Sequence, residues 1–202
     1  LYVTNPEELN HAVSKTQPRY IFFLHWNWRV PREIWSCIEC VCFHMTDLPY
    51  GRGGSPLQNL IMAGLNETKI SAFRMVEEMD AGPVYAKRRL SLEGRAEDIY
   101  RRAAGISWSL IDWIIENEPA PKPQSGDVIF FSRRRPQQSE LPKDGKLESI
   151  YDHIRMLDAA SYPLAFAEYG QFRLEFSDAE LHEDAVHAHV VLRRSDQGEV
   201  EE

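Results

Sequence analysis

The hydrophobic and polar positions in the N-terminal part of the chain alternate between strand-like and helix-like patterns. Strand-like runs occur at residues 20–24, 40–43, 68–76 and 84–92. The first two are continuously apolar, which is typical of strands buried on both faces of a sheet. Helices are expected to open at Pro6, with Asn5 as the cap, at Pro31 and at Pro56, and a long helix is expected over about 95–118. This alternation predicts an α/β fold with a parallel, Rossmann-like sheet.

The pattern changes after residue 118. Three prolines within residues 119–126 predict a linker. A short strand at 128–131, a helix at 147–157 and strands near 172–176 and 187–192 are expected beyond it. The expected organisation is therefore a catalytic domain at 1–118, a linker at 119–127 and a small C-terminal α+β subdomain at 128–202. Residue 1 is Leu rather than Met, so we expect the natural N-terminus to be missing, and one strand or more of the catalytic domain to be cropped, naturally abbreviated or absent.

Net charge, hydropathy and cysteine content argue against several classes of binding partner. The 202 residues include 23 Lys and Arg against 31 Asp and Glu, a net charge of −8, which argues against a nucleic-acid partner. No apolar window is long enough for a membrane span. The three cysteines, Cys37, Cys40 and Cys42, do not resemble a disulfide framework, so we expect a reducing cytoplasm. Cys37 and Cys40 lack a second ligand pair, so no metal is expected.

Two residues at predicted strand ends are candidates for proton transfer. His44 ends the second apolar run, and ligands of open parallel sheets bind at the carboxyl ends of strands. Imidazole is the side chain best suited to move protons near neutral pH. Asp80 follows in a turn beside Gly82, and a carboxylate near an imidazole can orient it or take a proton itself. The spacing alone also fits a structural histidine and a turn-forming aspartate.

Two local motifs favour the catalytic interpretation. Residues 44–56 read HMTDLPYGRGGSP and resemble the His-x-Ser-Leu-Leu-Pro-x-x-Arg-Gly-x-x-Pro signature of the formyltetrahydrofolate-dependent formyltransferases. Residues 79–84 read MDAGPV and resemble that family's second signature, Leu-Asp-x-Gly-x-Ile, at a matching separation. The resemblance covers about residues 20–118. It implies transfer of a formyl group from N10-formyltetrahydrofolate to an amine, with His44 stabilising the oxyanion and relaying protons and Asp80 handling a proton.

Cys42 departs from the family pattern, because other members have Asn two residues before the histidine. A thiol is a weak hydrogen-bond donor. Cys42 is therefore either a tolerated substitution, a sign of altered chemistry such as another acyl donor or a covalent nucleophile, or a sign of lost catalysis. Asn27 could supply the missing amide. The folate contacts expected are Trp26, Asn27, Met79 and Gly82, although the tryptophans flanking Asn27 also fit a core.

The acceptor is expected to be a nucleotide-linked amino sugar, from both charge and resemblance. A transfer-RNA-formylating member should have a larger C-terminal β-barrel and a basic surface, whereas this chain is acidic and has about 75 residues after the linker. Residues 154–166 resemble the sugar-modifying members of the family. The sequence of residues 51–59 is most similar to that of enzymes that act on a UDP-linked 4-amino-4,6-dideoxy sugar. The expected substrate contacts are Arg52, Gly53, Arg133 and Arg155, with Arg134 and Arg135 as further cations for a diphosphate.

Three other functions remain open at this point. They are an acyltransferase of the same fold with another donor, a hydrolase that releases formate from formyltetrahydrofolate, and a non-catalytic binding module. A homodimer is also left open.

Overall fold

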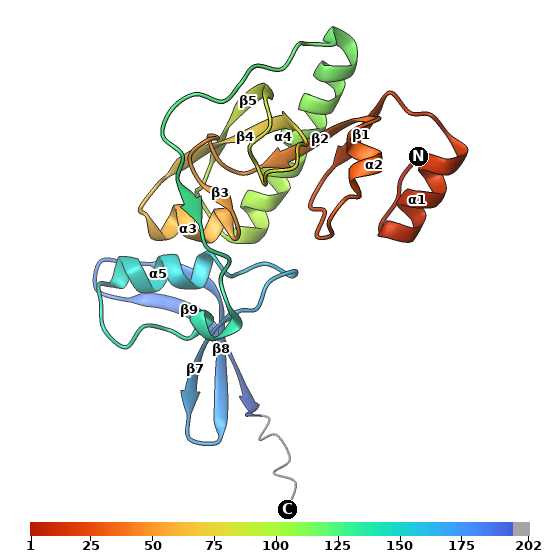
Figure 1. Cartoon of the computed structure of the whole chain (residues 1–202). Helices are drawn as coiled ribbons and strands as arrows, with labels where there is room; N and C mark the ends of the chain where they lie inside the picture. The colour runs from red at the N-terminus through yellow and green to blue at the C-terminus, as the bar shows by residue number, and fades with distance from the viewer. Residues whose placement is uncertain (196–202) are drawn as a thin grey trace, which may run out of the picture. The chain divides into compact units, whose positions relative to one another are not determined.

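The part of the chain that holds the candidate site is built on a four-stranded sheet. The computed structural model describes residues 1–195, which fall into two units. The first unit comprises Leu1–Pro56, Thr68–Leu90 and Arg102–Ser132. The second comprises Leu57–Glu67, Ser91–Arg101 and the chain from Arg133 onward. Figure 1 gives the element labels used below.

The first helix forms as its end signals predict. Helix α1 spans Pro6–Lys15, and the side chain of Asn5 accepts a hydrogen bond from the Glu8 N–H at 2.9 Å. Such a cap satisfies one of the N–H groups that have no partner inside the helix. Leu9 is buried on this helix in a cluster with Phe23 of β1. The predicted helix start at Asn5 and Pro6 is confirmed.

The main sheet is mixed rather than wholly parallel. Strands β1 (Tyr20–Phe23) and β2 (Glu39–His44) pair in parallel, joined through helix α2 (Arg32–Trp35). Strand β4 (Glu67–Arg74) runs antiparallel to β2, and β5 (Val84–Ser91) lies beside β4. The expected parallel sheet is therefore right for β1 and β2 and wrong for β2 and β4.

The connection between β2 and β4 leaves both strand directions possible. Residues 45–66 join the two strands, and helix α3, Pro56–Met62, supplies seven of these residues and is roughly 10 Å long. A connection of this length can span the roughly 20 Å of β2 in either direction. In the structure β4 starts at the end of the sheet where β2 finishes, with Ser71 opposite His44.

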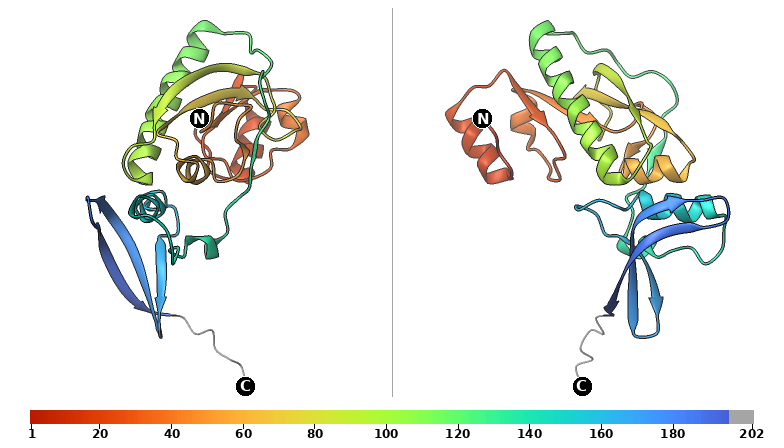
Figure 2. Two further views of the ribbon diagram at one scale, coloured as in Figure 1. Left: turned by 90° about the vertical axis from the view of Figure 1, so that its left-hand side faces the viewer. Right: turned by 180° about the vertical axis from the view of Figure 1, so that it is seen from behind.

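The predicted linker belongs to the first unit. Lys122 and Val84 exchange backbone hydrogen bonds of 2.7 and 2.8 Å, and strand β6 (Phe130–Phe131) pairs in parallel with β3 (Arg52–Gly53). Gly53 has φ +109°, and a Cβ there would lie 2.4 Å from the Phe131 carbonyl oxygen, so this pairing needs glycine. In Figure 2, the green stretch of chain that follows α4 runs along this unit.

The second unit combines the C-terminal segment with two earlier pieces of chain. Its sheet is antiparallel, with order β7-β8-β9, and helix α5 packs on β8. The bounds of these elements are Ala165–Tyr169 for β7, Phe172–Leu181 for β8, Val186–Arg194 for β9, Leu147–Arg155 for α5 and Pro136–Ser139 for a short 3-10 helix. Gln58 of α3 donates to the Met156 carbonyl oxygen at 3.0 Å and to the Tyr100 hydroxyl at 3.2 Å. The C-terminal segment therefore shares its interior with residues 57–67 and 91–101, and strand β7 was not predicted.

The longest helix is amphipathic rather than uniformly apolar. Helix α4 spans Ala96–Asn117, and its N-terminal residues, up to Arg101, belong to the second unit. It buries Ile99, Leu110 and Ile114 and exposes Trp108 and charged residues. Within residues 1–195, no helix combines the length and the apolar character needed to cross a membrane.

Arg155 is a buried structural cation of the second unit. Its Nη1 donates to the carbonyl oxygens of Leu92 (2.6 Å) and Gly94 (3.0 Å), and its Nε donates to Asp152 Oδ1 (2.6 Å). Only 8% of the side chain is exposed. The expected substrate contact by Arg155 stays a prediction, but these hydrogen bonds give the residue a clear structural role.

Arg155→Ala is expected to destabilise the protein because it leaves two carbonyl groups without their donor. Such groups cost about 2 kcal/mol in total when buried, which corresponds to a fall in Tm of about 4–8 °C for a chain of this size. Thermal unfolding followed by circular dichroism measures this change. Arg133→Ala is the matched control, because Arg133 is exposed, and its Tm should stay at the wild-type value. An unchanged Tm in Arg155→Ala would contradict the structural role.

Candidate active site

The three residues singled out by the signatures lie together in the first unit. His44 is the last residue of β2, and Cys42, two positions earlier, lies on the same face of that strand. Asp80 comes from the loop between β4 and β5, and its Oδ2 lies 3.8 Å from His44 Nδ1. Burial raises the pKa of the Cys42 thiol, and the Asp80 carboxylate raises it further. The sulfur therefore sits within the electrostatic reach of Asp80.

The hydrogen bond of His44 to the main chain defines its protonation pattern. His44 Nε2 lies 2.7 Å from the Gly51 carbonyl oxygen. Because a carbonyl can only accept, Nε2 must carry a proton and donate. Nδ1 is then the atom that faces Asp80, and it attracts the carboxylate only when it also carries a proton. The structure therefore places an imidazole nitrogen and a carboxylate oxygen, both groups able to exchange protons, 3.8 Å apart.

Backbone geometry places the Asp80 carboxylate. Asp80 has φ +54°, a left-handed conformation uncommon for residues other than glycine, and its Oδ2 accepts from the Gly53 N–H at 2.9 Å. Two residues on, a Cβ at Gly82 would lie 1.7 Å from the Arg74 carbonyl oxygen. Only glycine permits this close approach. The glycine of the second signature is thus explained by packing within the loop.

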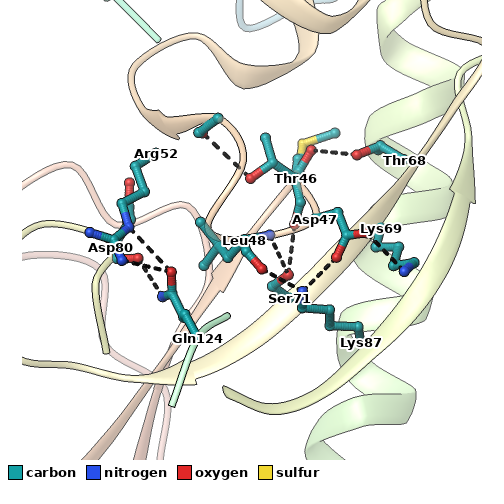
Figure 3. A network of polar contacts seen from close by, with 12 residues as sticks. Thr46, Asp47, Leu48, Arg52, Thr68, Lys69, Ser71, Asp80, Lys87 and Gln124 are labelled. Carbon is teal, nitrogen blue, oxygen red and sulfur yellow. Dashed lines mark hydrogen bonds and ion pairs between the residues drawn. The ribbon is translucent and has the colours of Figure 1, made fainter. Parts of the chain in front are cut away.

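A polar network fixes the segment that follows His44 (Figure 3). The Ser71 hydroxyl donates to the Thr46 carbonyl oxygen at 2.6 Å and accepts from the Leu48 N–H at 3.3 Å. Asp47 pairs with Lys69 at 2.8 Å and with Lys87 at 2.5 Å. Burial alone would raise the pKa of Asp47, but the hydrogen bonds from the two lysines outweigh it and lower that pKa. Sequence reasoning missed Ser71 and both lysines, because they belong to β4 and β5 and no local pattern indicates their partners.

Arg52 is largely buried and has partners inside the protein. Only 10% of its side chain is exposed, and its guanidinium donates to Gln124 Oε1 and to Glu78 Oε1. The expected contact of Arg52 with substrate stays a prediction. Gln124, which lies in the predicted linker, was not singled out by the sequence at all.

The candidate folate contacts divide between core and surface. Trp26 packs edge-to-face against Phe23 and Trp28, with ring centroids 5.5 and 5.0 Å apart, beside the buried cluster that includes Leu9. Asn27 and Met79 are exposed, the latter by 70%. Met79 adjoins Asp80 in the chain, so it is near the site, and its contact with folate stays a prediction.

No residue cluster suited to a metal ion accompanies this arrangement. In the part of the chain that the structure describes, no three His, Cys, Asp or Glu side chains are grouped to bind one. His44 and Asp80 can supply hydrogen bonding and proton transfer at this site.

The chain is similar in sequence and in structure to known formyltransferases. Residues 136–193 match the sequence profile of the methionyl-tRNA formyltransferase C-terminal domain. Methionyl-tRNA formyltransferase of Mesoplasma florum is 26% identical over 200 residues, which cover 93% of this chain and 63% of that protein. The structure of methionyl-tRNA formyltransferase from Clostridium thermocellum is similar with a TM-score of 0.92 and 47% identity, over 96% of this chain and 86% of that one.

A sugar-modifying enzyme shares the fold at lower identity. A sugar N-formyltransferase from a Shewanella species matches with a TM-score of 0.70 and 17% identity, over 91% of this chain and 78% of that one. At this identity the likeness concerns the fold alone. The higher identities are to proteins named for methionyl-tRNA rather than for sugars, which differs from the similarity expected from the motifs. The chain spans 63% of the length of the Mesoplasma florum protein.

Proposed function

This chain belongs to the formyltransferase family, and we propose that it transfers a formyl group from N10-formyltetrahydrofolate to the amine of a nucleotide-linked amino-deoxy sugar. The observation that carries formyl transfer is the His44–Asp80 pair, with Nε2 of the imidazole held by Gly51 and Nδ1 directed at the carboxylate. The two signature motifs supply both members of this pair.

The reaction requires the chain to move protons at two nitrogen atoms. A bond forms between the acceptor amine and the formyl carbon, and the bond from that carbon to folate N10 breaks. The folate supplies an activated formyl carbon. Asp80 accepts the proton that the amine loses, and the proton on His44 Nδ1 stabilises the negative oxygen and is available for N10. The Nδ1–Oδ2 distance of 3.8 Å exceeds a hydrogen bond, so neither atom has the other as its partner. Each can therefore interact with a reacting atom from the position in which Gly51 and Gly53 hold it.

Cys42 fits this scheme as a tolerated neighbour. Its raised pKa keeps the sulfur protonated at neutral pH, and a thiol is a poor nucleophile compared with a thiolate. Altered covalent chemistry is therefore disfavoured by the same burial that raises the pKa. The weak S–H group leaves most of the oxyanion stabilisation to His44.

Variants at Cys42 are expected to have small effects. Cys42→Ser and Cys42→Ala should each lose less than about tenfold in kcat/KM, because neither removes a strong donor. Cys42→Asn should keep or raise activity unless the larger amide clashes in its pocket. Steady-state rates test both, and intact-protein mass spectrometry tests for a formyl adduct. Complete loss in the Ser and Ala variants, together with a trapped thioester in the wild type, would instead support covalent catalysis.

Charge supports a small acceptor. Residues 136–193 contain five Lys and Arg against eleven Asp and Glu. A protein that binds transfer RNA neutralises phosphates with clustered cations, and this segment has an excess of anions. A nucleotide sugar presents only two phosphate groups, which one or two cations such as Arg133 can balance.

Methionyl-tRNA is the second candidate acceptor. The names of the relatives with the higher identities favour it. The two acceptors separate in one assay with N10-formyltetrahydrofolate as donor, in which methionyl-tRNA and a panel of nucleotide-linked 4-amino-4,6-dideoxy sugars are offered in parallel. Mass spectrometry of the products should show one added formyl group on a sugar.

The same assay tests the remaining alternatives. Formylation of methionyl-tRNA alone would replace the proposed acceptor while keeping the reaction. Formate release without any amine would indicate a hydrolase. Transfer from another acyl donor, or no binding of folate or nucleotide, would indicate an acyltransferase of different specificity or a binding module.

A further inference from the structure

The side chain of Gln124 joins two parts of the active-site region. Its Oε1 accepts from Arg52 Nε at 3.2 Å and from Arg52 Nη2 at 2.9 Å. Its Nε2 donates to the Asp80 carbonyl oxygen at 2.7 Å and to the Gly82 carbonyl oxygen at 2.8 Å. Figure 3 shows Arg52, Gln124 and Asp80 in contact. One amide thus links a buried guanidinium to the backbone of the Asp80 turn.

The orientation of this amide follows from the chemistry of its partners. A guanidinium has only donors, and the two backbone carbonyls have only acceptors. The oxygen of Gln124 must therefore face Arg52, and its nitrogen must face residues 80 and 82. All four interactions of the amide are used in this one arrangement, which few other side chains could reproduce.

The turn at Asp80 needs such support. A non-glycine residue at φ +54° is in a strained backbone conformation, which persists only where its surroundings hold it. The Gly53 N–H holds the carboxylate end of Asp80, and Gln124 holds its backbone end. Loss of either contact would let the carboxylate swing relative to His44 Nδ1.

Gly53 lies in one of two paired short strands, and Gln124 lies shortly before the other. Arg52 and Gly53 form β3, which pairs with β6, six residues after Gln124 in the chain. Arg52 Nη1 also donates to Glu78 Oε1 at 3.1 Å, which fixes the guanidinium on the same loop as Asp80. The segment after α4 therefore helps to hold the Asp80 carboxylate in position.

We propose that Gln124 is a positioning residue that, with Arg52, sets the orientation of the Asp80 carboxylate toward His44. The inference rests on the proposed function for its catalytic consequence, and on the hydrogen bonds above for its structural part. Gln124 acts through Asp80, so its loss is expected to lower kcat while leaving the KM of both substrates within about twofold.

Two substitutions at Gln124 distinguish the contribution of its amide oxygen from that of its amide nitrogen. Gln124→Glu keeps an oxygen for Arg52 but removes both donors to the carbonyl groups, whereas Gln124→Leu removes every hydrogen bond. Both variants should lose about tenfold to a hundredfold in kcat, since a displaced carboxylate misaligns proton transfer. Gln58→Leu is the matched control, because it also removes two hydrogen bonds from a buried glutamine, here in the second unit. It should lower Tm without changing kcat.

A measurement without catalysis completes the test. In protein labelled with 13C at aspartate carboxyl groups, the Asp80 signal is assigned by its absence from Asp80→Asn, and its chemical shift is compared between variants at one pH. Gln124→Leu and Gln124→Glu should change the chemical shift of the Asp80 carboxyl group because its position relative to Gly53 and His44 changes, and Gln58→Leu should leave it unchanged. A shift in the Gln124 variants supports the inference even if the wild type transfers no formyl group, in which case only the proposed function fails.

The following results would contradict the positioning role of Gln124. An unchanged kcat in Gln124→Leu would overturn the positioning role in an enzyme that is active. An unchanged Asp80 carboxyl signal in both Gln124 variants would overturn it whatever the activity, and a lower Tm alone would mark Gln124 as a structural residue.

Discussion

Asp80→Asn is expected to abolish formyl transfer while leaving the fold intact. The amide has nearly the size of the carboxylate, and its oxygen can still accept the 2.9 Å hydrogen bond from the Gly53 N–H. It cannot take a proton from the amine, and it removes the charge that faces His44 Nδ1. Loss of a positioned base typically costs 10²–10⁴-fold in rate, so kcat should fall by at least about 10³-fold.

The measurement is single-turnover formyl transfer together with thermal unfolding. Asp112→Asn on the exposed side of α4 is the matched control and should retain the wild-type rate. Near-normal turnover in Asp80→Asn would show that Asp80 is not the proton acceptor. A large fall in Tm would mean that the carboxylate supports the loop rather than the reaction.

His44→Asn is expected to lower kcat on the order of 10²-fold or more, because it removes the imidazole that stabilises the oxyanion and relays a proton. The asparagine amide can occupy the position of Nδ1, but it cannot titrate near neutral pH. It also loses the 2.7 Å hydrogen bond from Nε2 to the Gly51 carbonyl oxygen.

A second variant distinguishes the two nitrogen atoms. The amide of His44→Gln reaches the position of Nε2 and keeps the contact with Gly51, while Nδ1 is lost. If Nδ1 performs the proton transfer, His44→Gln should be as slow as His44→Asn although its Tm is closer to that of the wild type. His11→Asn on the exposed face of α1 serves as the control. Wild-type rates in both His44 variants would remove His44 from the mechanism.

Several elements were predictable because their signals are local. The helix start at Asn5 and Pro6, the apolar runs of β1 and β2 and the amphipathic span of α4 each follow from a few neighbouring residues. The two signature motifs likewise singled out His44 and Asp80, although the residues between them did not show that their side chains meet at 3.8 Å.

The direction of β4 required the tertiary structure. Apolar periodicity reports which residues are buried in a strand but contains no information on strand direction. The connection between β2 and β4 is long enough for either direction, so the direction is known only from the pairing of the folded strands, with His44 opposite Ser71.

What the sequence by itself determined about this protein is therefore its α/β class, most helix and strand positions and the two signature residues His44 and Asp80. The tertiary structure decided the roles of the other polar groups. Arg52 donates to Gln124, which lies 72 positions away, and Arg155 donates to Leu92, which lies 63 positions away. The physical reason is that burial patterns arise from each residue's own hydrophobicity, whereas a buried cation is satisfied by whichever acceptors the folded chain brings within hydrogen-bond distance.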